Sequence, residues 1–286
     1  MNAVAKTSLR NDAHLAWNPI RREVYVAAQN GGVVSILLLD PLRVVAKISD
    51  NVGWNAYSIA VNPDGTSIFV TFRTCTDGQG HSRIVKLDPI TKRATSSVRL
   101  ADECGSAYLA LSPDGERVYV SSDVGIGVYT TVDMLRELGH PNDSLLAGRL
   151  SASPDGRHLY IVQHGRLLKW DLRSGQVIGS KTLDGVMGRS PLLVSHDGSK
   201  VWVASLENGN QIYEVRASFL GPVRTINTGS QAHGLAESTD GSQLYVTEET
   251  NNVGTLKVYE LISGAAVRTI GLTFPKGVLV IPASQR

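Results

Sequence analysis

Short runs of alternating apolar and polar residues fill most of the chain, and they come in pairs that flank a recurring turn. A two-residue period of this kind is typical of β-strands with one buried face. Five of the turns contain an Asp-Gly pair, which supplies the backbone conformations that a tight hairpin needs. The five segments read VNPDGTSIFVTF, LSPDGERVYVSS, ASPDGRHLYIVQ, VSHDGSKVWVAS and ESTDGSQLYVTE, and a divergent sixth copy near the start reads AWNPIRREVYVAA.

The hairpins recur every 41 to 50 residues, and each is followed by two further strand-like runs, such as RLLKWDL and QVIGSKTL. Four strands in a repeat of this length are typical of a β-propeller blade. We therefore predict an all-β propeller of four-stranded antiparallel blades, with six blades favoured and seven left open. We expect one domain, 1–286, with repeats at 14–56, 57–106, 107–147, 148–189, 190–232 and 233–274 and a closing strand at 275–286.

The third repeat departs from the pattern. Its segment TTVDMLRELG predicts a short helix over residues 131–138 at the outer edge of the blade, and no fourth strand is evident there. At the chain ends, AVAKTSL is predicted to be a fourth strand and GVLVIPA a first strand. Pairing between the two ends would protect the open edges of the sheet.

The second strand of each hairpin resembles the repeat of the YVTN family of β-propellers, at VYVAA, IFVTF, VYVSS, LYIVQ, VWVAS and LYVTE. The resemblance covers roughly residues 14 to 282. It implies the propeller fold. It does not imply one function, because such propellers serve as enzymes, surface proteins and binding scaffolds.

Composition and charge indicate which kinds of partner and which cellular location to expect. The chain has 286 residues and a net charge of +2, which gives no basic footprint for nucleic acid. No apolar run is long enough to span a membrane, and the N-terminus lacks the apolar core of a secretory signal. We expect a cytoplasmic protein, or an exported one whose signal has been removed. Cys75 and Cys104 fall in loops that we expect on the same face of the propeller. A disulfide bond between them is therefore one alternative, and two separate thiols are the other.

A ligand site is predicted at one mouth of the central channel. The Asp-Gly turns are expected on the other face, where turn geometry explains them. Just before each first strand, and at the end of each second strand, almost every repeat offers a different large polar or aromatic residue. We assign acid–base catalysis to His233, Tyr57, Tyr108 and Arg149. The predicted ligand-binding residues are His14, Trp54, Arg73, Asp123, His164, Arg189, Glu249 and Lys276.

One of these residues carries a second resemblance. His233, in QAHGL, is similar to the His-Gly element of the virginiamycin B lyase type of propeller. That resemblance implies elimination chemistry at His233 and a carboxylate linked to a metal ion, for which Glu248 and Glu249 are the candidates. No motif fixes a metal site, so no metal ligand is assigned and a divalent metal is left open.

Two functions of different classes remain. The first is an enzyme that binds a small molecule at the channel mouth and acts on it by acid–base chemistry, as a lyase or lactone hydrolase. Arg73, Arg149 and Arg189 favour an anionic ligand, unless they pair with carboxylates of neighbouring blades. The alternative is a non-catalytic scaffold that binds a protein or glycan, for which the diagnostic feature is an exposed apolar patch.

Overall fold

The computed structural model describes residues 13–28, 32–39, 41–49, 55–76, 79–101, 107–122, 125–139, 148–207, 209–250, 253–273 and 277–281. The chain divides into two compact units. The first comprises residues 1–147 and 281–286, and the second comprises residues 148–280. The described residues contain no helix of the length and apolarity that crossing a membrane requires.

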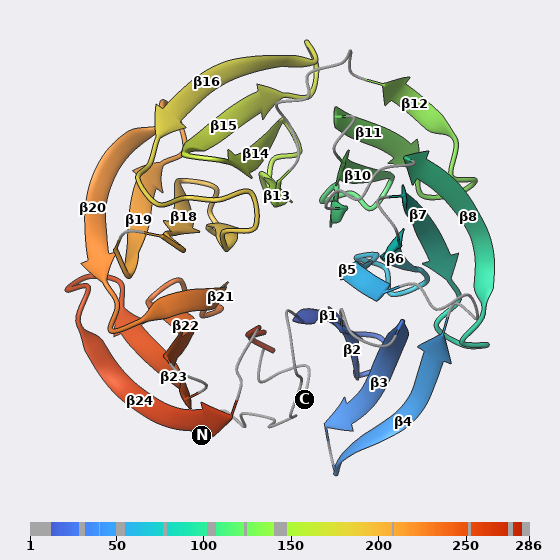
Figure 1. Ribbon diagram of the computed structural model, residues 1–286, viewed down its shortest axis with the longest axis horizontal. Helices are drawn as coiled ribbons and strands as arrows, with labels where there is room; N and C mark the ends of the chain where they lie inside the picture. The colour runs from blue at the N-terminus through green and yellow to red at the C-terminus, as the bar shows by residue number, and fades with distance from the viewer. Residues whose placement is uncertain are drawn as a thin grey trace. The chain divides into compact units, whose positions relative to one another are not determined.

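The protein is an all-β propeller of six four-stranded antiparallel blades (Figure 1). Within each blade, neighbours in the chain are neighbours in the sheet. The strands of the first unit are β1 (Ala13–Asn18), β2 (Glu23–Ala28), β3 (Val33–Leu39) and β4 (Leu42–Ser49) in blade 1, β5 (Asn55–Val61), β6 (Ile68–Thr76), β7 (Gln79–Leu87) and β8 (Ala94–Ala101) in blade 2, and β9 (Tyr108–Leu111), β10 (Arg117–Ser122), β11 (Gly125–Thr130) and β12 (Arg136–Gly139) in blade 3.

The second unit repeats this arrangement three times. Its strands are β13 (Leu150–Ala152), β14 (His158–Gln163), β15 (Arg166–Asp171) and β16 (Gln176–Thr182) in blade 4, β17 (Leu192–Val194), β18 (Lys200–Ala204), β19 (Gln211–Arg216) and β20 (Gly221–Asn227) in blade 5, and β21 (Gln231–Glu237), β22 (Gln243–Thr250), β23 (Val253–Glu260) and β24 (Ala266–Thr273) in blade 6. We call the turn between the first and second strands of a blade its inner turn, and the turn between the third and fourth its outer turn.

The inner turns are built as the sequence predicts. In blade 3, Asp114 accepts hydrogen bonds from the Glu116 amide (3.0 Å) and the Ser112 hydroxyl (2.5 Å), and Gly115 takes a positive φ of 74°. Blades 4, 5 and 6 repeat the Ser–Asp contact and the glycine. These hydrogen bonds hold the pKa of the turn aspartates below their usual range, as at Asp240, whose pKa falls to about 2. The Asp-Gly pairs are therefore turn residues.

The predicted helix at residues 131–138 is wrong. Residues 131–133 form the outer turn of blade 3, and β12 follows as the fourth strand that the sequence did not reveal. Met134 takes a positive φ of 61° and is 3% exposed in the core between blades 2 and 3. The Thr130 amide closes the turn on the Leu135 carbonyl at 2.9 Å. Burial of Met134 thus favours a hairpin over the local helical pattern.

The structure describes only residues 277–281 of the predicted closing strand at 275–286. Residues 277–281 are not in a strand, and the backbone of Gly277 and Val278 lies against Gly234, where a Cβ would come within 3.0 Å of both residues. The remaining residues of the predicted closing strand, and the N-terminal segment AVAKTSL, lie outside the described residues.

The hydrophobic core lies between neighbouring blades. Tyr25 and Val34 of blade 1 pack with Phe72 and Val85 of blade 2, and Tyr160 of blade 4 belongs to a cluster shared with blade 5. Further clusters join blades 2 and 3, and blades 5 and 6. Each blade is therefore stabilised by the next one in its unit, through apolar surface removed from water.

A cation from one blade also binds the outer turn of the next. Lys86 donates to the carbonyls of Thr131 and Val132 at 2.7 and 3.0 Å. Lys169 donates to Ala217 and Ser218 at 2.9 and 3.1 Å. In blade 5 the cation is Arg224, whose guanidinium bonds to the carbonyls of Leu261 and Ile262. We call these contacts the outer-turn clamps. They satisfy carbonyl groups that the turns leave without strand partners.

Candidate functional site

Four of the predicted site residues come together in the first unit. His14 lies on β1, Tyr57 on β5, Tyr108 on β9 and Arg73 on β6. The Tyr57 hydroxyl donates to the Tyr108 hydroxyl at 3.2 Å, and the two rings meet edge to face with centroids 5.1 Å apart. The His14 ring lies 6.5 Å from the Tyr57 ring and 5.8 Å from the Tyr108 ring. The Arg73 guanidinium carbon lies 4.9 Å from the centroid of Tyr57. We call these residues the His-Tyr cluster.

A β-bulge places Tyr57 in the His-Tyr cluster. In the pairing of β5 with β6, Ala56 lies opposite Phe72 and Ser58 opposite Thr71, so Tyr57 is the extra residue. Bulges redirect a side chain away from the regular alternation of a strand, and they are frequent beside active sites. The bulge turns the phenol toward the first strands of blades 1 and 3.

Buried hydroxyl groups fix the strands around the bulge. Thr71 is fully buried and donates from its hydroxyl to the Ala107 carbonyl at 2.6 Å, while it accepts from the Ser58 amide at 3.0 Å. The Ser58 hydroxyl accepts from the Leu109 amide at 3.3 Å. These contacts join blade 2 to the strand that carries Tyr108. The two phenols are therefore held at their hydrogen-bonding distance by the surrounding backbone.

The exposure of the cluster is uneven. Tyr57 is 7% exposed and Tyr108 is 3% exposed, whereas His14 and Arg73 are half-buried. The imidazole and the guanidinium are therefore the more accessible groups of the cluster, although the Nε2 atom of His14 is itself buried. The phenol pair is shielded from water, in surroundings where hydrogen bonds are stronger than in bulk solvent.

The second unit holds further predicted residues. His233 is the extra residue of a bulge between Ala232 and Gly234 in β21, the same device that positions Tyr57. His233 and Glu249 are half-buried, and Glu249 lies on β22 opposite Gln231. Neither bulge was predicted, because a bulge depends on how a strand pairs with its neighbour.

The remaining residues are placed as follows. Arg149, just before β13, is half-buried, and its backbone accepts from Val162 and donates to Gly188. His164 is exposed in the turn between β14 and β15, and Arg189 is exposed in the segment before β17. That residues of the two units share one channel mouth stays a prediction. Trp54, Asp123 and Lys276 lie outside the described residues.

Glu248 has a structural role. It is fully buried, and it accepts hydrogen bonds from the Tyr259 hydroxyl at 2.7 Å and the Gly229 amide at 3.2 Å. Lys257 Nζ neutralises it at 2.8 Å. With its lone pairs used in this way, the carboxylate is not available to a metal. Nowhere among the described residues do three or more His, Cys, Asp or Glu side chains form a group that could hold a metal ion.

Cys75, at the exposed end of β6, is disulfide-bonded. Cys104, its predicted partner, lies outside the described residues, so the pairing stays a prediction.

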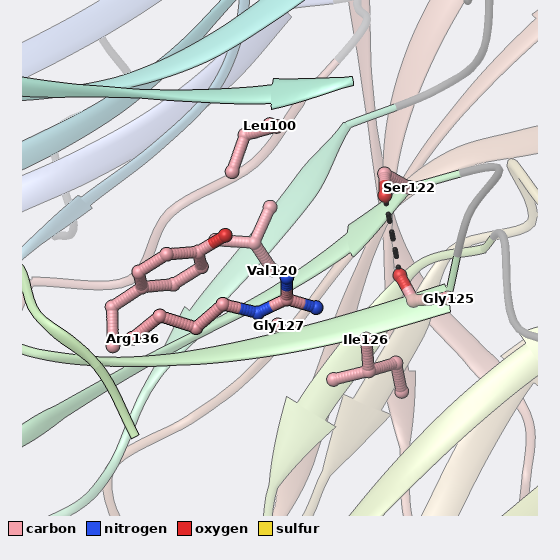
Figure 2. Close-up of a pocket in the computed structure, with 8 residues that line it drawn as sticks. Leu100, Val120, Ser122, Gly125, Ile126, Gly127 and Arg136 are labelled. Atoms are coloured by element: carbon pink, nitrogen blue, oxygen red, sulfur yellow. Dashed lines mark hydrogen bonds between the residues drawn. The ribbon is translucent and has the colours of Figure 1, made fainter. Parts of the chain in front are cut away.

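A small pocket in the first unit was not predicted. Its walls come from Leu100 on β8, Val120 on β10 and Arg136 on β12, and its floor is the Gly-Ile-Gly run of β11. Figure 2 shows Arg136 running beside Gly127 and the Ser122 hydroxyl bonding to the Gly125 carbonyl at 3.3 Å. Glycines inside a strand often mark a place that backbone or a ligand approaches closely, and DVGIGVYT was the available signal. The pocket is too slight to define a ligand.

Comparisons with known proteins support the fold class. The chain is similar in structure to the Cps50 (Swd1) β-propeller domain of Myceliophteria thermophila, at 15% identity and a TM-score of 0.70, over 95% of this chain and 90% of that one. It is also similar to hydrazine synthase of Kuenenia stuttgartiensis, at 18% identity and a TM-score of 0.65, over 89% of this chain and 78% of that one. At these identities the likeness shows the propeller fold alone. No family model and no curated sequence matches the chain.

Proposed function

We propose that the protein binds a small molecule at the His-Tyr cluster and transforms it by acid–base chemistry, as a lactone hydrolase or a lyase. The proposal is supported chiefly by the bulge at Tyr57, which brings two phenol oxygens within 3.2 Å of each other beside an imidazole. Neither the YVTN resemblance nor the two structural neighbours supplies this chemistry, so it depends on the residues themselves.

Each residue has a definite role in lactone opening. His14 takes a proton from water as the water oxygen adds to the lactone carbonyl carbon. The phenol O–H groups of Tyr57 and Tyr108 donate to the carbonyl oxygen as it gains negative charge. The ring C–O bond then breaks, and the leaving alkoxide receives the proton held by His14. Arg73 holds an anionic group of the substrate.

Elimination uses the same groups in another order. His14 removes a proton from the carbon next to a carbonyl, the phenols stabilise the resulting enolate, and the leaving group departs with the electron pair. In the second unit, His233 is the corresponding base that the lyase resemblance implies, with Arg149 as the cation beside the reacting oxygen. The two assignments predict different sensitive residues.

Hydrolysis of an aryl lactone such as dihydrocoumarin tests the proposal. We expect Tyr57→Phe and His14→Gln each to lower kcat/KM by about 100-fold or more without a change in Tm. The matched control is Tyr119→Phe, a buried tyrosine of β10 outside the cluster, which should keep full turnover. Turnover that survives both cluster variants but falls in His233→Ala would move the chemistry to the second unit. Turnover unchanged in all of them would overturn both site assignments, and no turnover by the wild type would overturn the enzyme proposal.

A scaffold function is the second candidate, and exposed apolar side chains on the outer turns favour it. Ile90 is 74% exposed, Val132 82%, Phe219 67% and Ile262 89%. A contiguous exposed apolar patch would mark a surface that binds another protein, and these outer turns each contribute one apolar side chain toward such a patch.

A further inference from the structure

The fourth strand of every blade carries an extra residue near its outer turn. In the pairing of β3 with β4, Ile36 lies opposite Ala46 and Leu37 opposite Val44, so Val45 is the extra residue. The other five blades repeat this β-bulge. We call the extra residues the outer bulges, and from blade 1 to blade 6 they are Val45, Thr95, Glu137, Ile178, Val223 and Val267. Because the residue types differ, the backbone irregularity is the feature that the six blades share.

The outer bulges lie on open sheet edges. Each fourth strand is at one end of its sheet, and among the described residues no further strand pairs with its outer side. All six outer bulges are exposed. Four of them are β-branched apolar residues, with exposed fractions of 37% at Val45, 54% at Ile178, 43% at Val223 and 55% at Val267. Such side chains favour strands, so these edges have the composition of a template on which another strand could pair.

A bulge interrupts the hydrogen-bonding pattern that such pairing needs. A regular strand directs the backbone N–H and C=O groups of alternate residues to the same side. One extra residue shifts this alternation and bends the strand, so a regular partner strand could match the open edge on one side of the bulge only. In β4, β16 and β20 the stretches beyond the bulge are 46–49, 179–182 and 224–227. Each is shorter than a typical strand of about five or six residues.

Other features beside the outer bulges also disfavour pairing. Pro222 directly precedes the bulge of β20 and has no N–H group to offer a partner strand. A second bulge, at Leu100, interrupts β8. Cations follow the outer bulges of β4, β16 and β24 closely, at Lys47, Lys181 and Arg268. Charges, prolines and bulges are the devices by which natural sheets avoid edge-to-edge association, and these outer edges combine all three.

We propose that the outer bulges protect the blades from strand pairing with a second copy of this chain. A second copy presents the same exposed β-branched residues, and its open edge can approach in antiparallel orientation. The bulges leave each fourth strand paired within its own blade but prevent a sheet from continuing beyond it. This role is separate from the His-Tyr cluster, so either proposal can fail without the other.

Deletion of Val267 tests the proposal at β24. The deletion would join Ala266 to residues 268–273 in one regular strand, without changing the pairs with β23 on either side of the bulge. We expect the variant to keep the circular dichroism of the wild type but to self-associate, so that its mass in sedimentation velocity rises with concentration. The amides of β24 should then exchange with deuterium more slowly. The matched control is Val267→Thr, which keeps the bulge and should stay monomeric like the wild type.

Deletion of Val45 repeats the test on β4 in the other unit, in case the Val267 deletion does not fold. A deletion variant that folds and stays monomeric would overturn the proposal. Equal self-association of Val267→Thr would overturn it too, because the side chain rather than the bulge would then control association. If neither deletion variant folds, the outer bulges serve packing within the blades and the proposal is wrong. Wild-type β24 amides that gain protection with protein concentration would also contradict it.

Discussion

Replacement of Lys169 by methionine should destabilise the second unit and alter a neighbouring histidine. Lys169 is 8% exposed, and its ammonium group clamps the carbonyls of Ala217 and Ser218 in the outer turn of blade 5. Methionine keeps most of the apolar stem but has no proton to donate. Tyr160 still donates to the Ala217 carbonyl at 3.0 Å, so that acceptor keeps one partner.

The magnitude follows from these contacts. A hydrogen bond to a charged group contributes about 1.5–3 kcal/mol. The Ser218 carbonyl belongs to an exposed residue and can turn to water, so the loss is closer to one bond than to two. We expect the free energy of unfolding to fall by about 2 kcal/mol. For a chain of this size that corresponds to a drop in Tm of about 3 °C.

His158 offers an independent readout. Burial and, after it, the positive charge of Lys169 hold the pKa of His158 below 6.5. Removal of that charge should raise the pKa toward 6.5, which NMR titration of the ring Cε1 proton would detect. Urea unfolding followed by tryptophan fluorescence measures the stability. Lys181→Met, on the half-exposed outer strand of the same blade, is the control with equal charge change. Unchanged stability together with an unchanged His158 titration in Lys169→Met would refute the clamp.

Two further changes test the packing between and within blades. Burial is the largest influence on Glu23 and raises its pKa, but hydrogen bonds from Lys92 and other donors outweigh it, so the folded-state pKa lies below 4.5. Its stabilisation is therefore present above pH 4.5 and is lost as the pH falls through the folded-state value. Glu23→Gln should lower the free energy of unfolding by about 2 kcal/mol at pH 7 and flatten the acid limb of a stability–pH curve. Parallel curves for the variant and the wild type would contradict this. Gly185→Ala should lower the free energy of unfolding, measured in urea, by more than about 3 kcal/mol. The reason is that φ is +65° at Gly185 and a Cβ there would lie 1.6 Å from the Glu207 carbonyl oxygen. Near-wild-type stability would show that this contact is easily relieved.

The sequence predicts those parts of the fold that local chemistry determines. A six-bladed propeller could be predicted from the Asp-Gly turns, the alternation of apolar and polar residues in the strands, and the repeat length. These features can be recognised in the sequence because each depends on a few neighbouring residues. The segment around Met134 shows the limit of this reasoning. A helical pattern is present there, but burial of Met134 against another blade outweighs it, and no local signal reports that burial.

The candidate site shows the same division. Aligning the repeats placed His14 and Tyr108 at one position and Tyr57 at the position before it, and the structure brings their rings together. The bulge at Tyr57 could not be predicted, since it depends on how β5 pairs with β6. The clamps were missed because each depends on a contact with the following blade.

The outer-turn clamps all have the same polarity along the chain. In every clamp the cation precedes its carbonyl acceptors in the chain, as Lys86 precedes Thr131 and Lys169 precedes Ala217. During synthesis, blades 2, 4 and 5 therefore each emerge with a donor whose carbonyl acceptors lie in the following blade. A fragment that stops after blade 4 would present the Lys169 ammonium at its open edge with no acceptor turn to bind. Successive blades are thus coupled from the N-terminus toward the C-terminus, and a chain cut between them ends in an edge that favours addition of the missing blade.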